Sequence, residues 1–156
     1  MKVERIASWV LAIGFAAALV FVVGLPKFIG PSPNPIFALI EGRSGIPFFE
    51  PELRYATGAG EFLAALLLII PSTRFLGAGL AGLITLSAIG FHLSPWLGVH
   101  LPEMSALTAQ LQDGRPVAEI DAMNLPTDGG ALFYTALVFL GLSLALLWLE
   151  RRRLQR

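Results

Sequence analysis

Four long apolar runs dominate the sequence, and segments rich in proline and charge separate them. Residues 6–25, 75–97 and 131–149 each approach or exceed the roughly 20 apolar residues that a helix needs to cross a lipid bilayer. The run 55–71 is shorter, about 25 Å long as a helix, and contains Glu61. Because leaving LAALLLII in water would be costly, we predict that this run also crosses the bilayer, which gives four spanning helices.

The connections between the predicted helices differ greatly in length. Only the residues 72–74 separate the second helix from the third, so we expect these two helices to be antiparallel neighbours. The first long loop, 26–54, contains six prolines, which exclude a regular helix over most of its length. This loop is nevertheless apolar (IFALI, then IPFF), and we expect it to lie on the helix ends or in the membrane interface.

The second long loop, 100–130, is acidic and contains one periodic segment. Met104, Leu107 and Leu111 fall on one helical face, and Asp113-Gly114 follows them. This spacing predicts a short amphipathic helix that ends at the aspartate and glycine.

Composition agrees with the pattern of apolar runs. Hydrophobic residues make up 55% of the chain and charged residues 14%, and the mean hydropathy is +0.71. We therefore predict an all-α membrane protein, a four-transmembrane-helix bundle with two long outer loops, in a single integral membrane domain over 1–156. The formal net charge is zero, which gives no basic surface for nucleic acid. The absence of cysteine excludes disulfides, thiolate ligands and iron–sulfur clusters.

The distribution of lysine and arginine predicts the orientation. With an even number of spans, both termini lie on one side, and that side carries Lys2, Arg5, Arg74, Arg151, Arg152, Arg153 and Arg156. The other side carries only Lys27, Arg43, Arg54 and Arg115. Because basic residues are retained in the cytoplasm, we predict cytoplasmic N- and C-termini in a bacterial or archaeal cell membrane, with the inner membrane as its location.

Glu61 is the acidic residue within a predicted span, and several polar residues lie at a comparable depth. Counting from the hairpin near Thr73 places Glu61 opposite Thr85 and His92 level with Arg54. Lys27 ends the first helix on the same outer side. Arg54 and Glu61 are seven residues apart and share a helical face.

Two interpretations of Glu61 remain open. It either locks the helices through an ion pair or hydrogen bonds, with an arginine or lysine from a neighbouring helix as partner, or it belongs to a functional site. In the second case, Lys27, Arg54, Glu61 and His92 would line an outer-leaflet pocket for a quinone, a lipid or a sulfur compound, with Glu61 as proton acceptor.

The histidines do not indicate a metal or haem site. His92 and His100 are eight residues apart with Pro95 between them, so they do not share a helical face, and no spacing of the HExxH type exists. We expect His92 to form hydrogen bonds near the membrane interface and His100 to be a solvated loop residue. No catalytic set and no intrinsic cofactor are predicted, and we expect no enzyme activity from the isolated chain.

The order of several motifs resembles the DoxX family of small four-helix bacterial and archaeal membrane proteins. The resemblance covers 24–93: GLPKF at the end of the first helix, GAGEFLAALLLI in the second, the turn PSTRFLGAGLAG, and SAIGFHL at the end of the third. It maps the features typical of the family onto Lys27, Glu61, Arg74 and His92. The long acidic loop 100–130 departs from the family pattern.

The resemblance implies a connection with membrane redox systems, since some members are subunits of quinol oxidase or thiosulfate:quinone oxidoreductase systems. We therefore predict an accessory or structural subunit of a larger respiratory or redox membrane complex, with other membrane subunits and the lipid bilayer as partners. The alternative is a quinone- or sulfur-compound-linked oxidoreductase component with a pocket around Glu61. A small transporter is the third candidate, although the chain shows no internal repeat and no pair of broken helices.

Overall fold

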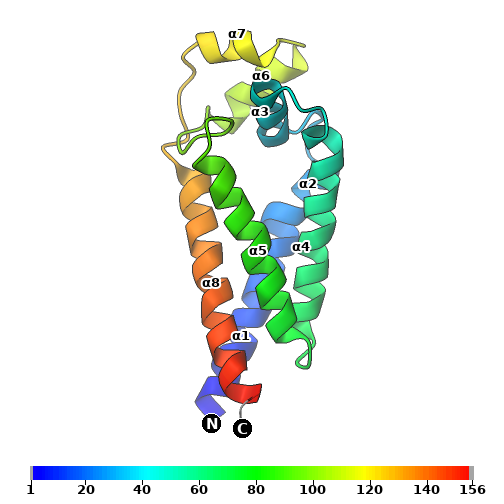
Figure 1. The fold of residues 1–156 in the computed structure, drawn as a ribbon, viewed down its shortest axis with the longest axis vertical. Coiled ribbons are helices and arrows are strands. Elements are labelled where there is room, and N and C mark those ends of the chain that lie inside the picture. The colour runs from blue at the N-terminus through cyan, green and yellow to red at the C-terminus, as the bar shows by residue number, and fades with distance from the viewer. Residues whose placement is uncertain (1, 155–156) are drawn as a thin grey trace.

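Four long helices run side by side in the computed structural model, which describes residues 2–154, with side chains from 4 to 152. They are α1 (Lys2–Ala18), α4 (Arg54–Ile69), α5 (Arg74–His92) and α8 (Ala131–Leu154). Both ends of the chain lie at one end of these helices (Figure 1). Three shorter helices, which we call the cap, cover the other end: α3 (Pro35–Ser44), α6 (Met104–Gln112) and α7 (Val117–Ala122).

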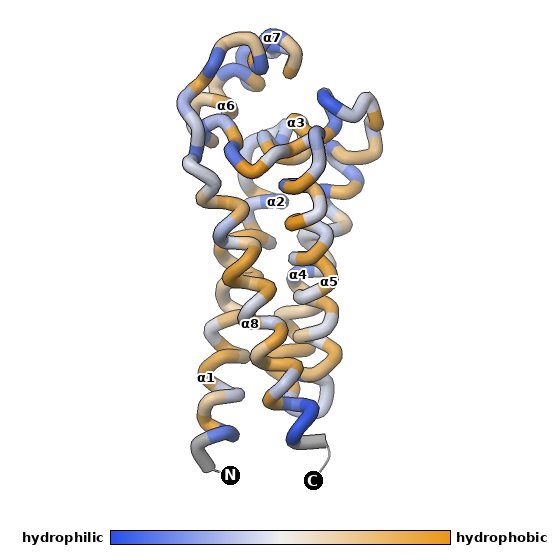
Figure 2. The backbone as a smooth tube through the Cα atoms, turned by 60° about the vertical axis from the view of Figure 1, so that its left-hand side comes forward, coloured by the Kyte–Doolittle hydropathy of each residue, from blue (hydrophilic) through white to orange (hydrophobic). Residues whose placement is uncertain are grey.

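Within the described residues, three segments are long and apolar enough to cross a membrane: Glu4–Ile29, Arg74–His92 and Ala131–Arg152. The first of them continues from α1 through the π-helical turn η1 (Leu19–Gly24) into α2 (Pro26–Ile29). The predicted second span corresponds to α4, which has 16 residues and is shorter than the other three. Figure 2 shows hydrophobic colours along the long helices and hydrophilic colours gathered in the cap and near the termini.

The predicted end of the third span was wrong by five residues. The helix α5 ends at His92 rather than at residue 97, and the backbone N–H of Leu93 closes its last turn on the carbonyl of Ile89. Pro95 follows three residues later, and a proline disfavours the helical conformation in the residue before it. The chain then turns across the end of the bundle toward the cap.

The expectation of an irregular first outer loop was also wrong. The loop contains α2, the ten-residue helix α3 and the π-helical turn η2 (Phe49–Leu53). Pro26 and Pro35 stand at the first positions of their helices, where a missing N–H costs nothing. The side chain of Asn34 caps α3 by accepting hydrogen bonds from the N–H groups of Ile36 and Phe37.

The second outer loop holds the predicted amphipathic helix as α6, and Leu107 on its apolar face is fully buried. The sequence did not predict α7. Together with α3, these helices enclose an apolar core of their own, formed by Leu39, Ile40, Phe49, Leu97, Leu101, Leu107 and Ile120. The cap is therefore a packed layer rather than a pair of loose loops.

A second core lies inside the bundle of long helices. Its fully or nearly fully buried members are Ala12, Phe15, Ala16, Leu19, Ala64, Ala65, Leu68, Ala78, Ala81 and Leu146. Many of them are small, because close helix packing needs little side-chain volume at the contact. Gly77 shows this directly, since an added Cβ would lie 2.7 Å from the backbone nitrogen of Leu68.

The tight hairpin between α4 and α5 confirms that these helices are antiparallel neighbours (Figure 1). Of the basic residues that predict the orientation, Arg156 lies outside the described residues, and the side chains of Lys2 and Arg153 lie outside them too.

Candidate functional site

Lys27 directly follows a π-helical turn and a proline. The first long helix widens into the π-helical turn η1, in which the N–H of Leu25 donates to the carbonyl of Val20, and Pro26 then has no N–H with which to continue the pattern. The carbonyl of Val23, one turn before Lys27, accepts a hydrogen bond from the Lys27 ammonium, at 2.9 Å. Single π-turns of this kind often occur at functional sites. Here the turn directs the Lys27 side chain back toward the bundle.

Two glycines let this segment approach α4 closely. A Cβ on Gly24 would lie 2.8 Å from Cε1 of Phe62, and a Cβ on Gly58 would lie 2.6 Å from Cε2 of Phe28. Both distances are shorter than real Cβ contacts allow, so larger residues would push α2 away from α4. Because Gly58 is one turn before Glu61, the close approach places Lys27 beside the glutamate.

Lys27 and Glu61 form a buried ion pair. The ammonium lies 2.7 Å from Oε1 and 2.8 Å from Oε2 of Glu61, and the two side chains are 15% and 7% exposed. Together with the carbonyl of Val23, these contacts use all three hydrogens of the ammonium. One of the two interpretations of Glu61 gave it an arginine or lysine from a neighbouring helix as partner, and Lys27 takes that position.

The ion pair lies at the wall of a cavity of about 180 Å³. The walls come from η1, α2, η2, α4, α5 and α8, and α3 supplies the roof through Ile36, Phe37 and Ile40. Most of the lining is apolar. Polar groups are contributed by Lys27, Thr57, Glu61, Thr85, Ser87, His92 and Thr135.

His92 lies at the cap end of this cavity, where α5 ends. Its Nδ1 is 2.8 Å from the carbonyl oxygen of Gly98, and its ring packs edge-on against Phe133. A carbonyl can only accept, so Nδ1 must carry the hydrogen of this bond. His92 therefore forms a hydrogen bond, as expected, and His100 is exposed, as expected.

Arg54 does not line the cavity, although it is buried. Its Nη1 lies 2.8 Å from Oε1 of Glu50, and its Nη2 is 2.6 Å from the hydroxyl of Tyr55. Burial raises the pKa of Glu50 above 4.5, although the N–H of Asn34 and the charge of Arg54 both act to lower it. Of the four predicted site residues, the structure brings Lys27, Glu61 and His92 to one cavity and places Arg54 beside it, in a separate ion pair.

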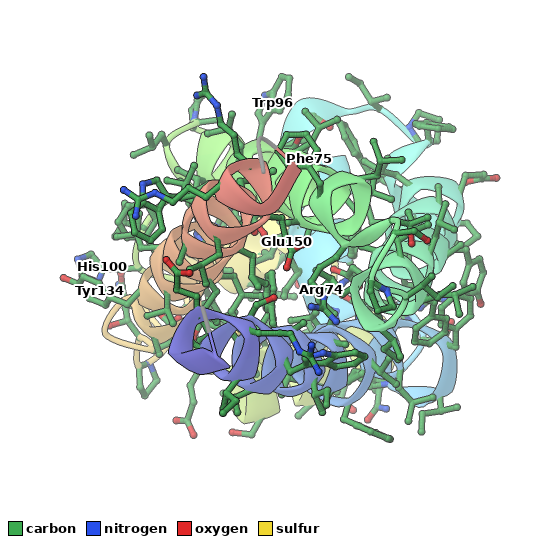
Figure 3. The ribbon with its side chains drawn as sticks, turned by 90° about the horizontal axis from the view of Figure 1, so that it is seen from below. Arg74, Phe75, Trp96, His100, Tyr134 and Glu150 are labelled. Carbon is green, nitrogen blue, oxygen red and sulfur yellow. The ribbon has the colours of Figure 1, made fainter. Side chains whose placement is uncertain are left out.

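A second polar cluster at the terminal end was not predicted as a site. We call Ser8, Arg74 and Glu150 the inner cluster, and all three are buried. Nη1 of Arg74 donates to Ser8 Oγ at 2.8 Å and lies 3.4 Å from Glu150 Oε1, and Ser8 Oγ also donates to that carboxylate. In the view from below, Arg74 and Glu150 lie inside the ring of long helices (Figure 3).

Apolar packing separates the inner cluster from the cavity on every long helix. On α5, for example, Ala78 and Ala81 stand between Arg74 and Thr85, and both are fully buried. Ser143 is the buried polar residue at this level, and its hydroxyl donates to its own helix at the carbonyl of Phe139. The cavity therefore ends on a dry layer and does not continue to the terminal end.

The described residues contain no group of three histidine or acidic side chains placed to hold a metal ion. Comparison with known proteins adds no family: no family model, no curated protein and no solved structure matches this chain significantly. The resemblance to the DoxX family thus stays a prediction from motifs, and the function must be argued from the site itself.

Proposed function

We propose that this chain is a four-span, DoxX-like membrane protein that holds a quinone-class molecule in its cap-end cavity as a component of a membrane redox complex. The observation that carries the proposal is the cavity beside the buried Lys27–Glu61 pair. Binding sites are typically concave and apolar, with a few fixed polar groups, and this cavity has that character.

The size of the cavity suits one six-membered ring. A dry protein cavity of about 150 Å³ binds benzene, and the cavity described above has about 180 Å³. Its charges cancel locally, because both oxygens of Glu61 accept hydrogen bonds from Lys27. An uncharged ring with polar substituents fits such a lining better than an ion does.

Two variants of α8 provide the direct test of ligand binding. Ala136 lines the cavity, whereas Val138 on the same helix is 60% exposed on the outer surface of the bundle. Ala136→Phe should fill the cavity, and Val138→Phe adds the same ring outside it. We expect quinone to co-purify with the wild-type chain and with Val138→Phe in mild detergent, as measured by mass spectrometry, and to be lost from Ala136→Phe. Equal quinone content in all three would sink the proposal.

The four-span arrangement can be tested by labelling, because the chain has no cysteine. With α4 as a span, the hairpin residue Ser72 lies in the cytoplasm and the cap residue Asp113 lies outside. An impermeant maleimide added to intact cells should then label Asp113→Cys and leave Ser72→Cys unlabelled. The reverse pattern would mean either that the molecule is inverted or that α4 does not cross the membrane, and it would overturn the proposed arrangement in both cases. This experiment also tests the cytoplasmic position of the termini, since both lie at the hairpin end of the bundle (Figure 1).

A second function, that of an accessory subunit, is favoured by the cap. The cap has an apolar core of its own, so its outer surface is a fixed shape that a partner subunit can bind. Purification of a tagged chain in mild detergent should then recover stoichiometric membrane subunits. Recovery of a lone chain that carries quinone would contradict the accessory-subunit role and support the ligand-binding role.

A further inference from the structure

The polar groups around the cavity differ in whether the protein itself supplies their hydrogen-bond partners. The ammonium of Lys27 and both oxygens of Glu61 are occupied by each other and by the carbonyl of Val23. Thr57 and Thr135 donate to carbonyls of their own helices, at Leu53 and Ala131. None of these groups needs a ligand to complete its hydrogen bonds.

His92 has one ring nitrogen left over. Because Nδ1–H donates to the carbonyl of Gly98, Nε2 of the neutral ring has no hydrogen and is an acceptor. Among the described residues nothing donates to Nε2, and Nε2 is not one of the fully buried side-chain atoms without a partner, so it is accessible on a residue that lines the cavity. The edge-on contact with Phe133 helps to hold the ring in this orientation.

Thr85 is the second group without a partner. Threonine and serine hydroxyls in helices usually bond to the carbonyl four residues earlier, as Ser87 does to Leu83 on the same helix. The hydroxyl of Thr85 makes no such bond, and no other described residue contacts it by a hydrogen bond, although the residue is only 6% exposed. It lines the cavity, where a ligand oxygen can reach it.

The two unsatisfied groups lie on one face of α5 at a useful separation. Thr85 and His92 are seven residues apart, which is two turns or about 10 Å along the helix. Two hydrogen bonds of about 2.8 Å each, joined by a ring with an oxygen at each end, span a similar length. A ring with oxygens at opposite positions can therefore contact both groups at once.

We propose that the cavity selects an uncharged ring that carries two opposite oxygens, with a hydroxyl that donates to Nε2 of His92 and a second oxygen that contacts the hydroxyl of Thr85. This inference rests on the proposed ligand-binding function and deepens it. Within the quinone class it selects the reduced form, because a carbonyl has no hydrogen to donate to His92.

Two stable probes separate the role of the hydroxyl from that of the ring. 4-Methoxyphenol keeps one hydroxyl, and 1,4-dimethoxybenzene keeps both oxygens but has no hydrogen to donate. Binding is measured by equilibrium dialysis of the purified chain in detergent, with protein-free micelles as the blank. We expect 4-methoxyphenol to bind about fivefold more tightly, which is the effect of one ordinary hydrogen bond.

Variants of the two residues should change the two affinities differently. His92→Asn keeps a donor for the Gly98 carbonyl but removes Nε2, so the preference for 4-methoxyphenol should vanish while the affinity for 1,4-dimethoxybenzene is retained. Thr85→Val removes the hydroxyl at constant shape and should weaken both probes about equally, which leaves their ratio unchanged. Because the wild-type ratio is itself a test, the experiment does not depend on either variant folding.

The possible failures are distinguishable. Equal affinity of the wild-type chain for the two probes would overturn the selection of a hydroxyl and leave the ligand-binding function standing. Failure of both probes to bind, or binding that Ala136→Phe does not weaken, would overturn the inference and the ligand-binding function together.

Discussion

Two of the buried ion pairs among the described residues show how similar groups serve different purposes. In the inner cluster, the side chains of Arg74 and Glu150 are 1% and 4% exposed, and the neighbouring core is fully packed. At the cap end, Lys27 and Glu61 are 15% and 7% exposed and lie at the wall of a cavity. A buried pair in a packed surrounding can act only on the fold. A buried pair at a cavity can also act on a ligand.

The choice of cation follows the same division. The guanidinium of Arg74 donates to the carbonyl of Leu68 through Nε and to Ser8 through Nη1, and it lies 4.2 Å over the ring of Trp9. A planar, multi-donor group of this kind joins several helices at once. Lys27 instead supplies a compact point charge that Glu61 neutralises. The inner cluster is thus a clamp between α1, α4, α5 and α8, whereas the cap-end pair shapes one wall.

The largest expected effect comes from breaking the clamp. Arg74→Met should lower the free energy of unfolding by about 3–5 kcal/mol, because it leaves a buried carboxylate without its guanidinium. Thermal unfolding in mild detergent measures the loss. Binding of 4-methoxyphenol to the molecules that remain folded should stay unchanged, since the dry layer separates Arg74 from the cavity.

The matched control for this variant removes both charges. Arg74→Met combined with Glu150→Met should recover most of the lost stability, since well-packed apolar residues often replace a buried ion pair without net cost. If the double variant were as unstable as the single one, the inner cluster would stabilise the fold by more than the mutual neutralisation of its two charges.

The cap-end pair should show the opposite balance of effects. Lys27→Met should lower the free energy of unfolding by about 1–3 kcal/mol, the cost of leaving a hydrogen-bonded group unsatisfied, because the cavity lets Glu61 find another partner. It should also weaken probe binding, which Arg74→Met does not. Unfolding and dialysis on the two variants side by side provide the measurement. Equal losses of stability with unchanged binding in both would remove the distinction between the two regions.

Counting residues from the hairpin placed Glu61 opposite Thr85, since a helix rises regularly along its axis, and both residues line the cavity. It did not predict that Arg54 turns away. Sharing a helical face with Glu61 fixes only the direction of the Arg54 side chain. Glu50, four residues earlier in the acidic segment before α4, is close enough to form the ion pair.

Two further features escaped sequence reasoning for physical reasons. The prolines of the first outer loop were read as helix breakers, but their effect depends on position, and Pro35 begins α3 instead of interrupting it. Arg74 entered as a basic residue of the terminal side and as one of the positions that the family resemblance maps, and Glu150 did not enter at all. Whether such residues face inward depends on the crossing of α1, α5 and α8, which no local pattern reveals.

A smaller effect is expected at the surface of the cap. Arg43 forms a pair with Asp121 at 2.7 Å and also donates to the carbonyl of Leu97, which ties α3, the roof of the cavity, to α7 and to the turn after α5. Asp121→Asn should cost about 0.2–1 kcal/mol, the usual range for an exposed pair. The difference from wild type should disappear in 1 M salt, which screens surface charges. A loss that persists in high salt would mean that the pair is more enclosed than its exposure indicates.

The smallest effect concerns the pair that lies just outside the cavity, Glu50 with Arg54. Burial raises the pKa of Glu50 above 4.5 in the folded protein, and its Oε2 has no hydrogen-bond partner among the described residues. The folded state therefore holds the proton more tightly than the unfolded chain. The resulting stabilisation is complete below pH 4.5 and is lost as the pH rises through the folded pKa.

Glu50→Gln removes this titration, so the difference in melting temperature between wild type and variant should change with pH. We expect the melting temperature of wild type to rise relative to that of Glu50→Gln as the pH is lowered from 7.5 to 4.5. Thermal unfolding in one buffer series measures this difference. If the melting temperature of wild type instead fell relative to that of the variant at low pH, the attraction of Arg54 for the carboxylate would exceed the cost of burying it. Arg54–Glu50 would then resemble the inner cluster, as a pair whose charges stabilise the fold.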